Sequence, residues 1–213
     1  EAILSINDSG PVTTTGALSV TADSINAGSN ITTGGNLTLT STAGAITTKA
    51  LSSAAGLSLK STGGKIETGT IGLTGATGAL SIDAGTTLST GAITSSSSSA
   101  ATIKSGTSLT TGSINLTSTA AGAGNFSMTS GTTLTTNAIS STISGNINLT
   151  SGSNLSTSTI SLTSANSGDL NLTAGGTLST GDITHSGSGD MTLSAGADLT
   201  PAKIQKLATG TNE

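Results

Sequence analysis

The residues that could perform acid–base chemistry are few and scattered. The chain has no arginine and no cysteine, and a general acid and base must both lie within hydrogen-bond reach of one substrate. Six of the seven aspartates fall mostly at different positions of the sequence repeat described below: Asp23, Asp83, Asp169, Asp182, Asp190 and Asp198. We therefore expect a protein that is not an enzyme and binds no cofactor. A polysaccharide-processing β-helix, which would need carboxylates clustered on one face, is a remote alternative.

The other potential metal ligands also lack partners. His185 is the only histidine, so it has no second imidazole with which to hold a metal, and we expect it in a solvated loop. Asp169 and Asp190 share one repeat position with three asparagines: Asn36, Asn125 and Asn146. Asx residues at one position favour a ladder of turn hydrogen bonds. We expect no metal site.

The charges are sparse and weakly acidic, with a formal net charge of −4. All six basic residues are lysines; Lys49, Lys60 and Lys65 could come together across coils, although edge protection explains them equally well. There is neither a basic stripe nor an aromatic platform, so nucleic acid is an unsuitable partner. No apolar run approaches the roughly 20 residues of a membrane span, so we expect no membrane insertion.

These residues are positioned by an internal repeat. Residues 78–94 (GALSIDAGTTLSTGAIT) recur at 168–184 (GDLNLTAGGTLSTGDIT) and more loosely at 124–140. Each repeat opens with an apolar-x-apolar strand, and the sequence assigns ten such pairs, beginning with Leu4/Ile6 and Leu18/Val20 and ending with Met191/Leu193. A second anchor such as Leu88 follows six residues later, and a third such as Ile93 five residues after that. Polar residues alternate with the anchors, as expected for strands with one buried face.

Three short strands per repeat predict an all-β, right-handed parallel β-helix of about nine to ten coils of roughly 21 residues. The whole of 1–213 is one solenoid segment, with 1–17 a short, atypical first coil and 200–213 a terminal coil or tail. Open strand edges predict pairing with adjacent coils of a longer parent rod, or with neighbouring copies end to end.

One column is especially regular. Two residues after the second anchor, threonine recurs in seven coils, where we expect a structural ladder: Thr48, Thr68, Thr90, Thr111, Thr136, Thr157 and Thr180. The next residue is of a type that tolerates positive φ in a tight turn: Gly69, Gly91, Gly112, Asn137 and Gly181. Pro201 then takes the threonine position, and because it cannot donate to a ladder we expect it to break the pattern.

The grammar G-[ND]-x-x-L-[ST]-[AS]-G-x-x-L-x-T-G, as in residues 168–181, resembles the repeat region of filamentous-haemagglutinin-like adhesins. The resemblance covers nearly the whole chain. It implies the shaft of a two-partner secretion exoprotein, secreted to the bacterial cell surface and active in adhesion, aggregation or biofilm. The Asn-Pro-Asn-Gly signature of that family's secretion domain does not occur here.

The segment between the third strand and the next coil varies most in length, and such insertions usually mark a binding face. Residues 74–77 are one candidate. The others form a possible recognition edge for surface glycans or cell-surface receptors: Ser95, Ser96, Ser97, Ser98, Ser99, Ala120, Gly122 and Gly124. A spacer without a partner is the competing interpretation.

The sequence thus predicts a non-catalytic structural or adhesive rod segment. Two alternatives remain open. Open ends favour a self-stacking filament subunit. Outward hydroxyl pairs such as Thr133/Thr135 favour, more remotely, an ice-binding solenoid, although Asn154, Lys65 and Glu67 interrupt the array.

Overall fold

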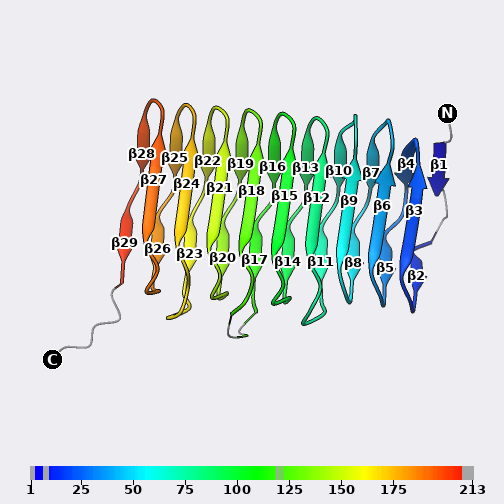
Figure 1. Cartoon of the computed structure of the whole chain (residues 1–213), viewed down its shortest axis with the longest axis horizontal. Helices are drawn as coiled ribbons and strands as arrows, with labels where there is room; N and C mark the ends of the chain where they lie inside the picture. The colour runs from blue at the N-terminus through cyan, green and yellow to red at the C-terminus, as the bar shows by residue number, and fades with distance from the viewer. Residues whose placement is uncertain (1–2, 7–9, 119, 121, 208–213) are drawn as a thin grey trace.

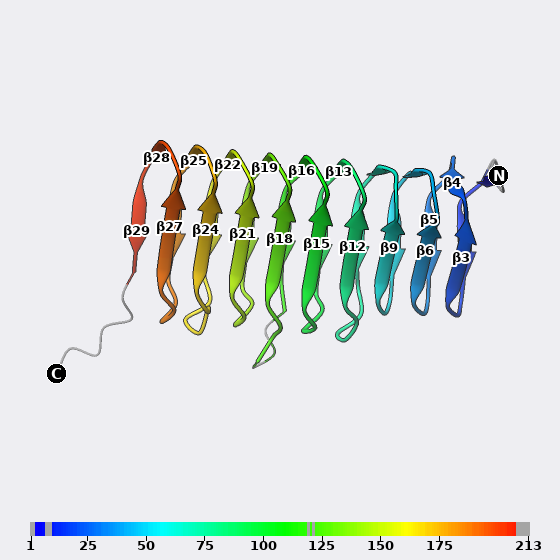
Figure 2. The same ribbon diagram turned by 45° about the horizontal axis from the view of Figure 1, so that its top comes forward.

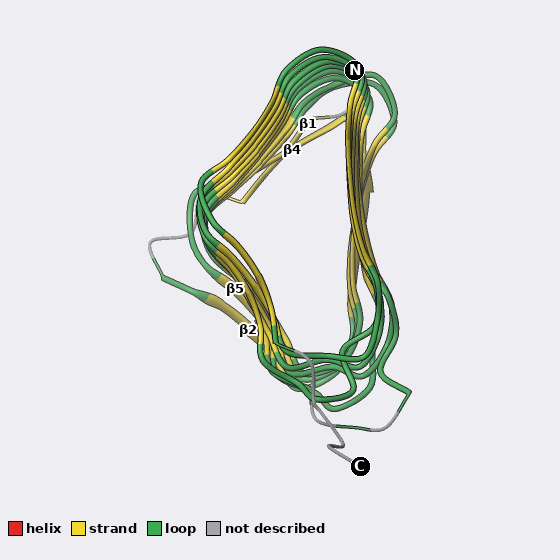
Figure 3. Ribbon diagram, turned by 90° about the vertical axis from the view of Figure 1, so that its left-hand side faces the viewer, coloured by secondary structure: helices red, strands yellow, loops and turns green. Residues whose placement is uncertain are grey.

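The computed structural model describes residues 3–6, 10–118, 120 and 122–207. Its strands wind into a β-solenoid in which successive coils stack along one axis (Figure 1). Viewed along that axis, the coil is triangular and encloses a single core (Figure 3). Every strand pairing in the described chain is parallel, and each joins strands of successive coils, as the turned view also displays (Figure 2). The predicted fold class is confirmed.

Each side of the triangle is one sheet. The first sheet holds the first strand of each coil: β3 (Leu18–Ala22), β6 (Leu37–Ser41), β9 (Leu57–Ser61), β12 (Leu80–Ala84), β15 (Ala101–Ser105), β18 (Phe126–Ser130), β21 (Ile147–Ser151), β24 (Leu170–Ala174) and β27 (Met191–Ala195). The second sheet holds β1 (Ile3–Ile6), β4 (Ser24–Ala27), β7 (Ile46–Thr48), β10 (Ile66–Thr68), β13 (Leu88–Thr90), β16 (Leu109–Thr111), β19 (Leu134–Thr136), β22 (Leu155–Thr157), β25 (Leu178–Thr180) and β28 (Leu199–Pro201). The third sheet holds β2 (Val12–Thr14), β5 (Ile31–Thr33), β8 (Leu51–Ser53), β11 (Ile71–Leu73), β14 (Ile93–Ser95), β17 (Ile114–Leu116), β20 (Ile139–Ser141), β23 (Ile160–Leu162), β26 (Ile183–His185) and β29 (Ile204–Lys206).

The alternation in the sequence becomes an inside and an outside. In β12, Leu80, Ile82 and Ala84 are buried while Ser81 and Asp83 are exposed, because successive side chains of a strand point to opposite faces. The parallel register then places side chains of the same type above one another in successive coils. In one such column Leu88 pairs with Leu109, and Leu109 pairs with Leu134. The core is therefore a bundle of aliphatic columns that runs the length of the rod.

The start of the chain differs from the prediction. Leu4 pairs with Ile25, and Ile25 pairs with Ile46, so β1 and β4 belong to the second sheet. The prediction that Leu4 and Ile6 open a first-sheet strand is wrong. An apolar-x-apolar pattern is the same in any of the three sheets, and only the pairing between coils decides which sheet a strand joins.

Pro201 does not break the pattern. It lies in β28 in register with Thr180, and the coil continues through β29. The N–H of Leu178 and the carbonyl of Thr180 both bond to the following coil, to Asp198 O at 2.9 Å and Ala202 N at 3.1 Å. The nitrogen at the threonine position therefore faces away from the preceding coil, and Pro201 forfeits no hydrogen bond to β25.

The glycines after the threonine column also have a different cause. Among the described residues, positive φ occurs only at Gly78 and Gly122, so the five column positions do not use the tolerance of positive φ that their residue types offer. A Cβ added to Gly69 would lie 3.0 Å from Ala50 N, and one on Gly91 would lie 3.0 Å from Gly69 C. Successive coils stack about 4.8 Å apart, and that close backbone approach, not the turn conformation, favours glycine.

A second glycine column closes the corner between the first and second sheets. In each member a Cβ would clash with a backbone carbonyl of the coil below: Gly85, Gly106, Gly131, Gly152, Gly175 and Gly196.

No helix in the described part of the chain is long and apolar enough to cross a membrane.

Candidate functional site

Three of the aspartates, Asp83, Asp182 and Asp198, lie on three different sides of the coil. Among the residues that the structure describes, no three His, Asp, Glu or Cys side chains gather where they could hold a metal ion. Asp83 lies between Lys60 and Lys104, in register with both on the outward face of the first sheet. Asp182 and Asp198 are exposed just before β26 and β28, on two different sheets.

Asp169 and Asp190 form an inter-coil ladder with the asparagines before them. The backbone N–H of Asn146 donates to Asn125 Oδ1 at 2.9 Å, that of Asp169 to Asn146 Oδ1 at 2.9 Å, and that of Asp190 to Asp169 Oδ1 at 2.8 Å. Asn36 accepts in the same way from Gly56 N at 2.8 Å. The side chains of Asn36, Asn125, Asn146 and Asp169 thus each satisfy a backbone donor of the next coil and act in stacking.

His185 does not lie in a solvated loop, so that prediction is wrong. It is the last residue of β26, with 0% of its surface exposed, and its Nε2 lies 3.1 Å from Gly168 O. The same position is held by Leu162 one coil earlier. Strand alternation turns this position inward in every coil, and nothing in the residue type signals that.

The three lysines that could have formed a basic cluster lie on different parts of the coil. Lys49 follows β7 at the corner between the second and third sheets, Lys60 lies in β9 of the first sheet, and Lys65 precedes β10 of the second. Lys65 Nζ is 2.7 Å from Glu67 Oε2, and this hydrogen bond with its charge attraction lowers the pKa of Glu67. The arrangement offers no site for a polyanion.

The threonine column is buried, with each side chain between 2% and 7% exposed. In five coils the hydroxyl donates to the carbonyl of the next residue, at 3.0–3.1 Å: Thr48, Thr68, Thr90, Thr111 and Thr157. Thr136 donates instead to Gly112 O, one coil below, at 3.3 Å. The column therefore satisfies the carbonyls of the corner between the second and third sheets.

Sequence reasoning missed a related column on the last residue of the first-sheet strands. Its serines face inward and are buried: Ser41, Ser61, Ser105, Ser130 and Ser151. Ser41 Oγ donates to Asp23 O at 2.6 Å or Gly44 O at 2.8 Å, and Ser61 Oγ donates to Gly44 O at 2.7 Å. The recurrence of a small residue four positions after the first anchor was the available signal.

The serine run of the possible recognition edge is bound to the coil beneath it. Ser96 Oγ donates to Leu73 O at 3.2 Å, Ser97 Oγ to Gly78 O at 2.8 Å, and Ser98 Oγ to Ala76 O at 3.0 Å. The other two hydroxyls act as acceptors. Ser95 Oγ accepts the backbone N–H of Ser97, and Ser99 Oγ accepts the backbone N–H of Gly78. These side chains hold two corner loops together, which leaves them few free hydrogen-bonding groups.

The second part of that edge, residues 117–125, is the longest of these corners in the middle of the rod. Ala123 is buried, Ala120 and Gly122 are exposed, and Gly124 N donates to Ser98 O at 2.7 Å. Residues 119 and 121 lie outside the described residues. Recognition at this corner stays a prediction, and its exposed part is the backbone around Gly122.

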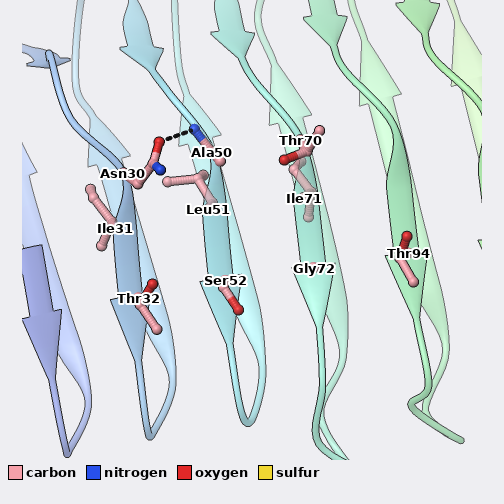
Figure 4. A pocket seen from close by; sticks show the side chains of 10 residues that line it. All are labelled: Asn30, Ile31, Thr32, Ala50, Leu51, Ser52, Thr70, Ile71, Gly72 and Thr94. Carbon is pink, nitrogen blue, oxygen red and sulfur yellow. Dashed lines mark hydrogen bonds between the residues drawn. The ribbon is translucent and has the colours of Figure 1, made fainter. Parts of the chain in front are cut away.

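A shallow groove of about 320 Å³ crosses the outward face of the third sheet over β5, β8, β11 and β14 (Figure 4). Gly72 leaves a gap in the outward column that carries Thr32, Ser52 and Thr94. Asn30 Oδ1 accepts the N–H of Ala50 at 3.2 Å. The lining contains hydroxyl, amide and aliphatic groups without charge, so the groove suits an uncharged polar ligand better than an ion.

The outward face of the second sheet carries hydroxyls in register, for example Thr110 on Thr135. In the described part of the chain these hydroxyls donate to no protein acceptor between β13 and β25. Asn154 enters the array before β22, and the Lys65–Glu67 pair occupies it at β10. Ice binding at this face stays a prediction.

The fold and its columns define the class: a parallel β-solenoid repeat protein with three strands per coil. No protein-family model matches the chain, and neither the curated proteins nor the solved structures include a significant match.

Proposed function

We propose that the chain is a non-catalytic structural and adhesive rod segment of a secreted bacterial surface exoprotein of the filamentous-haemagglutinin-like type. One observation carries the proposal: polar side chains at positions that recur from coil to coil, such as Thr136 and Asn146, satisfy backbone groups of neighbouring coils. The repeat is thus used for stacking, which suits a rod.

The resemblance of the repeat grammar to adhesin shafts supports the same role. A regular rod displays long outward faces rich in hydroxyl and amide groups, which can make many weak contacts with glycans or receptors at a cell surface. The groove beside Gly72 and the corner around Gly122 are two places in the described chain where these faces depart from regularity. A location outside the cell, at the bacterial surface, belongs to this proposal.

Retention of coated beads under flow tests the adhesive role. Beads that carry the chain are expected to stay on epithelial cells or on glycan-coated glass at shear rates that remove albumin-coated beads. Retention equal to that of albumin on both surfaces would contradict an adhesive role.

The variant Leu199→Asn/Ile204→Asn/Leu207→Asn is the matched control, because it removes the exposed apolar side chains at one end of the rod and leaves the long faces intact. The proposal predicts that this variant is retained like the wild type. Loss of retention in the variant would assign the adhesion to contacts at the end.

A self-stacking filament subunit is the second candidate, and the C-terminal coil favours it. Leu199, Ile204 and Leu207 are 45%, 47% and 43% exposed, and in the described chain β27, β28 and β29 each pair on one side only. Such edges template further strands. Pro201 opposes this, because its nitrogen faces the open side without a hydrogen.

Electron microscopy separates the two candidates. Single rods at all protein concentrations are expected for the first, and unbranched fibres that disappear in the triple asparagine variant for the second.

A further inference from the structure

The outward face of the third sheet carries no charge at the middle position of any strand that the structure describes. This column runs from β2 to β29 and holds Thr13, Thr32, Ser52, Gly72, Thr94, Asn115, Ser140, Ser161, Thr184 and Gln205. The first sheet, in contrast, presents Lys60, Asp83 and Lys104 outward, and the second presents Glu67. A ligand that lies along the third sheet therefore meets hydrogen-bonding groups without charge.

Gly72 makes part of this face a groove. Among the described strands of the third sheet it is the only middle residue without a side chain, and a Cβ added there would meet nothing closer than Ser52 Oγ, 3.8 Å away. The groove of about 320 Å³ extends over β5, β8, β11 and β14 (Figure 4). These strands belong to four successive coils about 4.8 Å apart, so the groove runs along the rod axis for roughly 14 Å.

The hydroxyls along the groove are available to a ligand. Four of them line it, and none has a hydrogen-bond partner among the described residues: Thr32, Ser52, Thr70 and Thr94. The next, inward hydroxyl of β5 differs, because Thr33 Oγ1 donates to Gly35 O at 2.8 Å. Each free hydroxyl can both donate and accept a hydrogen bond.

Asn30 adds a donor whose orientation is fixed. Its Oδ1 accepts the N–H of Ala50, in the next coil, at 3.2 Å, and Figure 4 shows the two residues side by side where their strands begin. Because a backbone N–H can only donate, the amide oxygen must face it, and the two hydrogens on Nδ2 are left for a ligand. A donor held in place in this way costs less conformational entropy on binding than a mobile one.

These features select the chemistry of the ligand. Uncharged donors and acceptors in register complement the hydroxyls of a sugar chain, and Ala50 and the threonine methyl groups can contact its C–H groups. A polyanion would find no cation in the lining. A peptide strand would find no free backbone edge, because β5, β8, β11 and β14 each pair on both sides.

We infer that the groove binds a neutral, unbranched oligosaccharide that lies along the rod axis. The Asn30 amide donates to it, and the hydroxyls of Thr32, Ser52 and Thr94 exchange hydrogen bonds with it. The inference rests on the proposed adhesive function and names a ligand class for it. A shallow groove without aromatic rings holds one sugar chain weakly, so strong adhesion needs many rods on one surface.

NMR titration of the full chain with linear hexasaccharides tests the inference. The neutral probes are maltohexaose, cellohexaose, mannohexaose and N-acetylchitohexaose, and a heparin hexasaccharide is the charged comparison. At least one neutral probe is expected to shift the amide signals of β5, β8, β11 and β14 and to leave those of β20 and β23 unchanged. No shift in the four groove strands with any neutral probe, or tighter binding of the heparin probe there, would overturn the inference.

Two variants locate the contact, and circular dichroism checks that they fold. Gly72→Thr fills the gap with the side chain that Thr94 already brings to this column, and it should abolish the shifts. Asn30→Asp keeps an oxygen for the N–H of Ala50 but removes the free donors, so it should weaken binding roughly two- to tenfold. Ser140→Thr, which enlarges a side chain of the same column outside the groove, is the matched control and should bind like the wild type. Undiminished binding in Gly72→Thr would place the ligand elsewhere and refute the site.

Bead retention under flow keeps this inference separate from the adhesive role. If beads are retained on cells while no neutral probe reaches the groove, the adhesive role stands and the ligand class is wrong. If a neutral probe binds in the groove but beads are not retained, the groove is a carbohydrate site and the adhesive role is wrong.

Discussion

Phe126 stacks directly on Ala101. The two residues are in register in β18 and β15, and they are 1% and 7% exposed. Phe126 is the only aromatic residue of the chain, and Ala101 is the only alanine in its inward column, which otherwise holds leucine, isoleucine or methionine. The large side chain therefore lies where the coil below leaves space, and the summed volume of the two positions is kept.

This complementarity predicts a strong coupling between the two positions. Ala101→Leu should cost about 1–3 kcal/mol through overpacking, and Phe126→Leu roughly 1–2 kcal/mol through the cavity it leaves. The double variant restores the Leu-on-Leu packing of other coils, so its unfolding free energy should lie closer to the wild type than the sum of the single changes. Chemical denaturation gives the unfolding free energies of all four proteins. If the losses of the two single variants add up to that of the double variant, the two side chains do not share one space.

The glycine column predicts a position-dependent cost of a single methyl group. In Gly131→Ala the Cβ would meet the carbonyl group of Gly106 one coil below, so we expect a loss of about 1–3 kcal/mol in the unfolding free energy. Gly16→Ala is the matched control, because no atom lies within 4 Å of its Cβ and its φ is not positive. Gly16→Ala should be neutral or stabilising. Similar losses in both variants would place the cause in the turn conformation instead of the contact between coils.

The buried threonine column predicts that loss of an inward hydroxyl lowers the unfolding free energy, whereas loss of an outward hydroxyl does not. Thr136 Oγ1 donates to Gly112 O at 3.3 Å, and it can accept from Thr111 Oγ1 at 2.9 Å as an alternative to the bond of Thr111 to Gly112 O. Thr136→Val removes both bonds without a change of shape and should cost about 1 kcal/mol. Thr135→Val, on the exposed face of the same strand, should stay within about 0.5 kcal/mol of the wild type. Equal losses of unfolding free energy in the two variants would show that the inward and outward hydroxyls of β19 contribute alike to stability.

The pair of Lys65 and Glu67 predicts a local electrostatic effect without a stability effect. Its hydrogen bond and charge lower the pKa of Glu67, so Lys65→Gln should raise that pKa toward its ordinary value, which carboxyl carbon NMR can follow. A lowered folded-state pKa gives a contribution present above the unfolded value and lost as pH falls through the folded value. Both side chains are about half exposed, so water screens the pair and the midpoint of unfolding should not change measurably. An unchanged pKa in the variant would contradict the pairing.

The repeat allowed the strand columns to be predicted because periodicity is a local property. Alternation around Leu88, Leu109 and Leu134 indicates one buried face, and equal spacing indicates parallel stacking, so both follow from residue types alone. The threonine column was found in the same way. The small serine column at Ser105 escaped notice because Ser and Thr also fill the outward positions.

The errors occurred where the deciding contact lies one coil away. The pattern of Leu4 and Ile6 is compatible with any sheet until Leu4 meets Ile25. His185 is polar by type and buried by its register with Leu162. Pro201 is tolerated because its nitrogen faces away from Thr180.

Sequence alone therefore determined the class of fold, the length of the coil and the inward columns, since these depend on spacing along the chain. Only the tertiary structure decided which sheet the first strands join, why glycine lines the corners, which serines of the 95–99 run are engaged and where the imidazole of His185 lies. Each of these depends on a neighbour about 20 residues away in sequence but about 4.8 Å away in space, and a local pattern does not specify that neighbour.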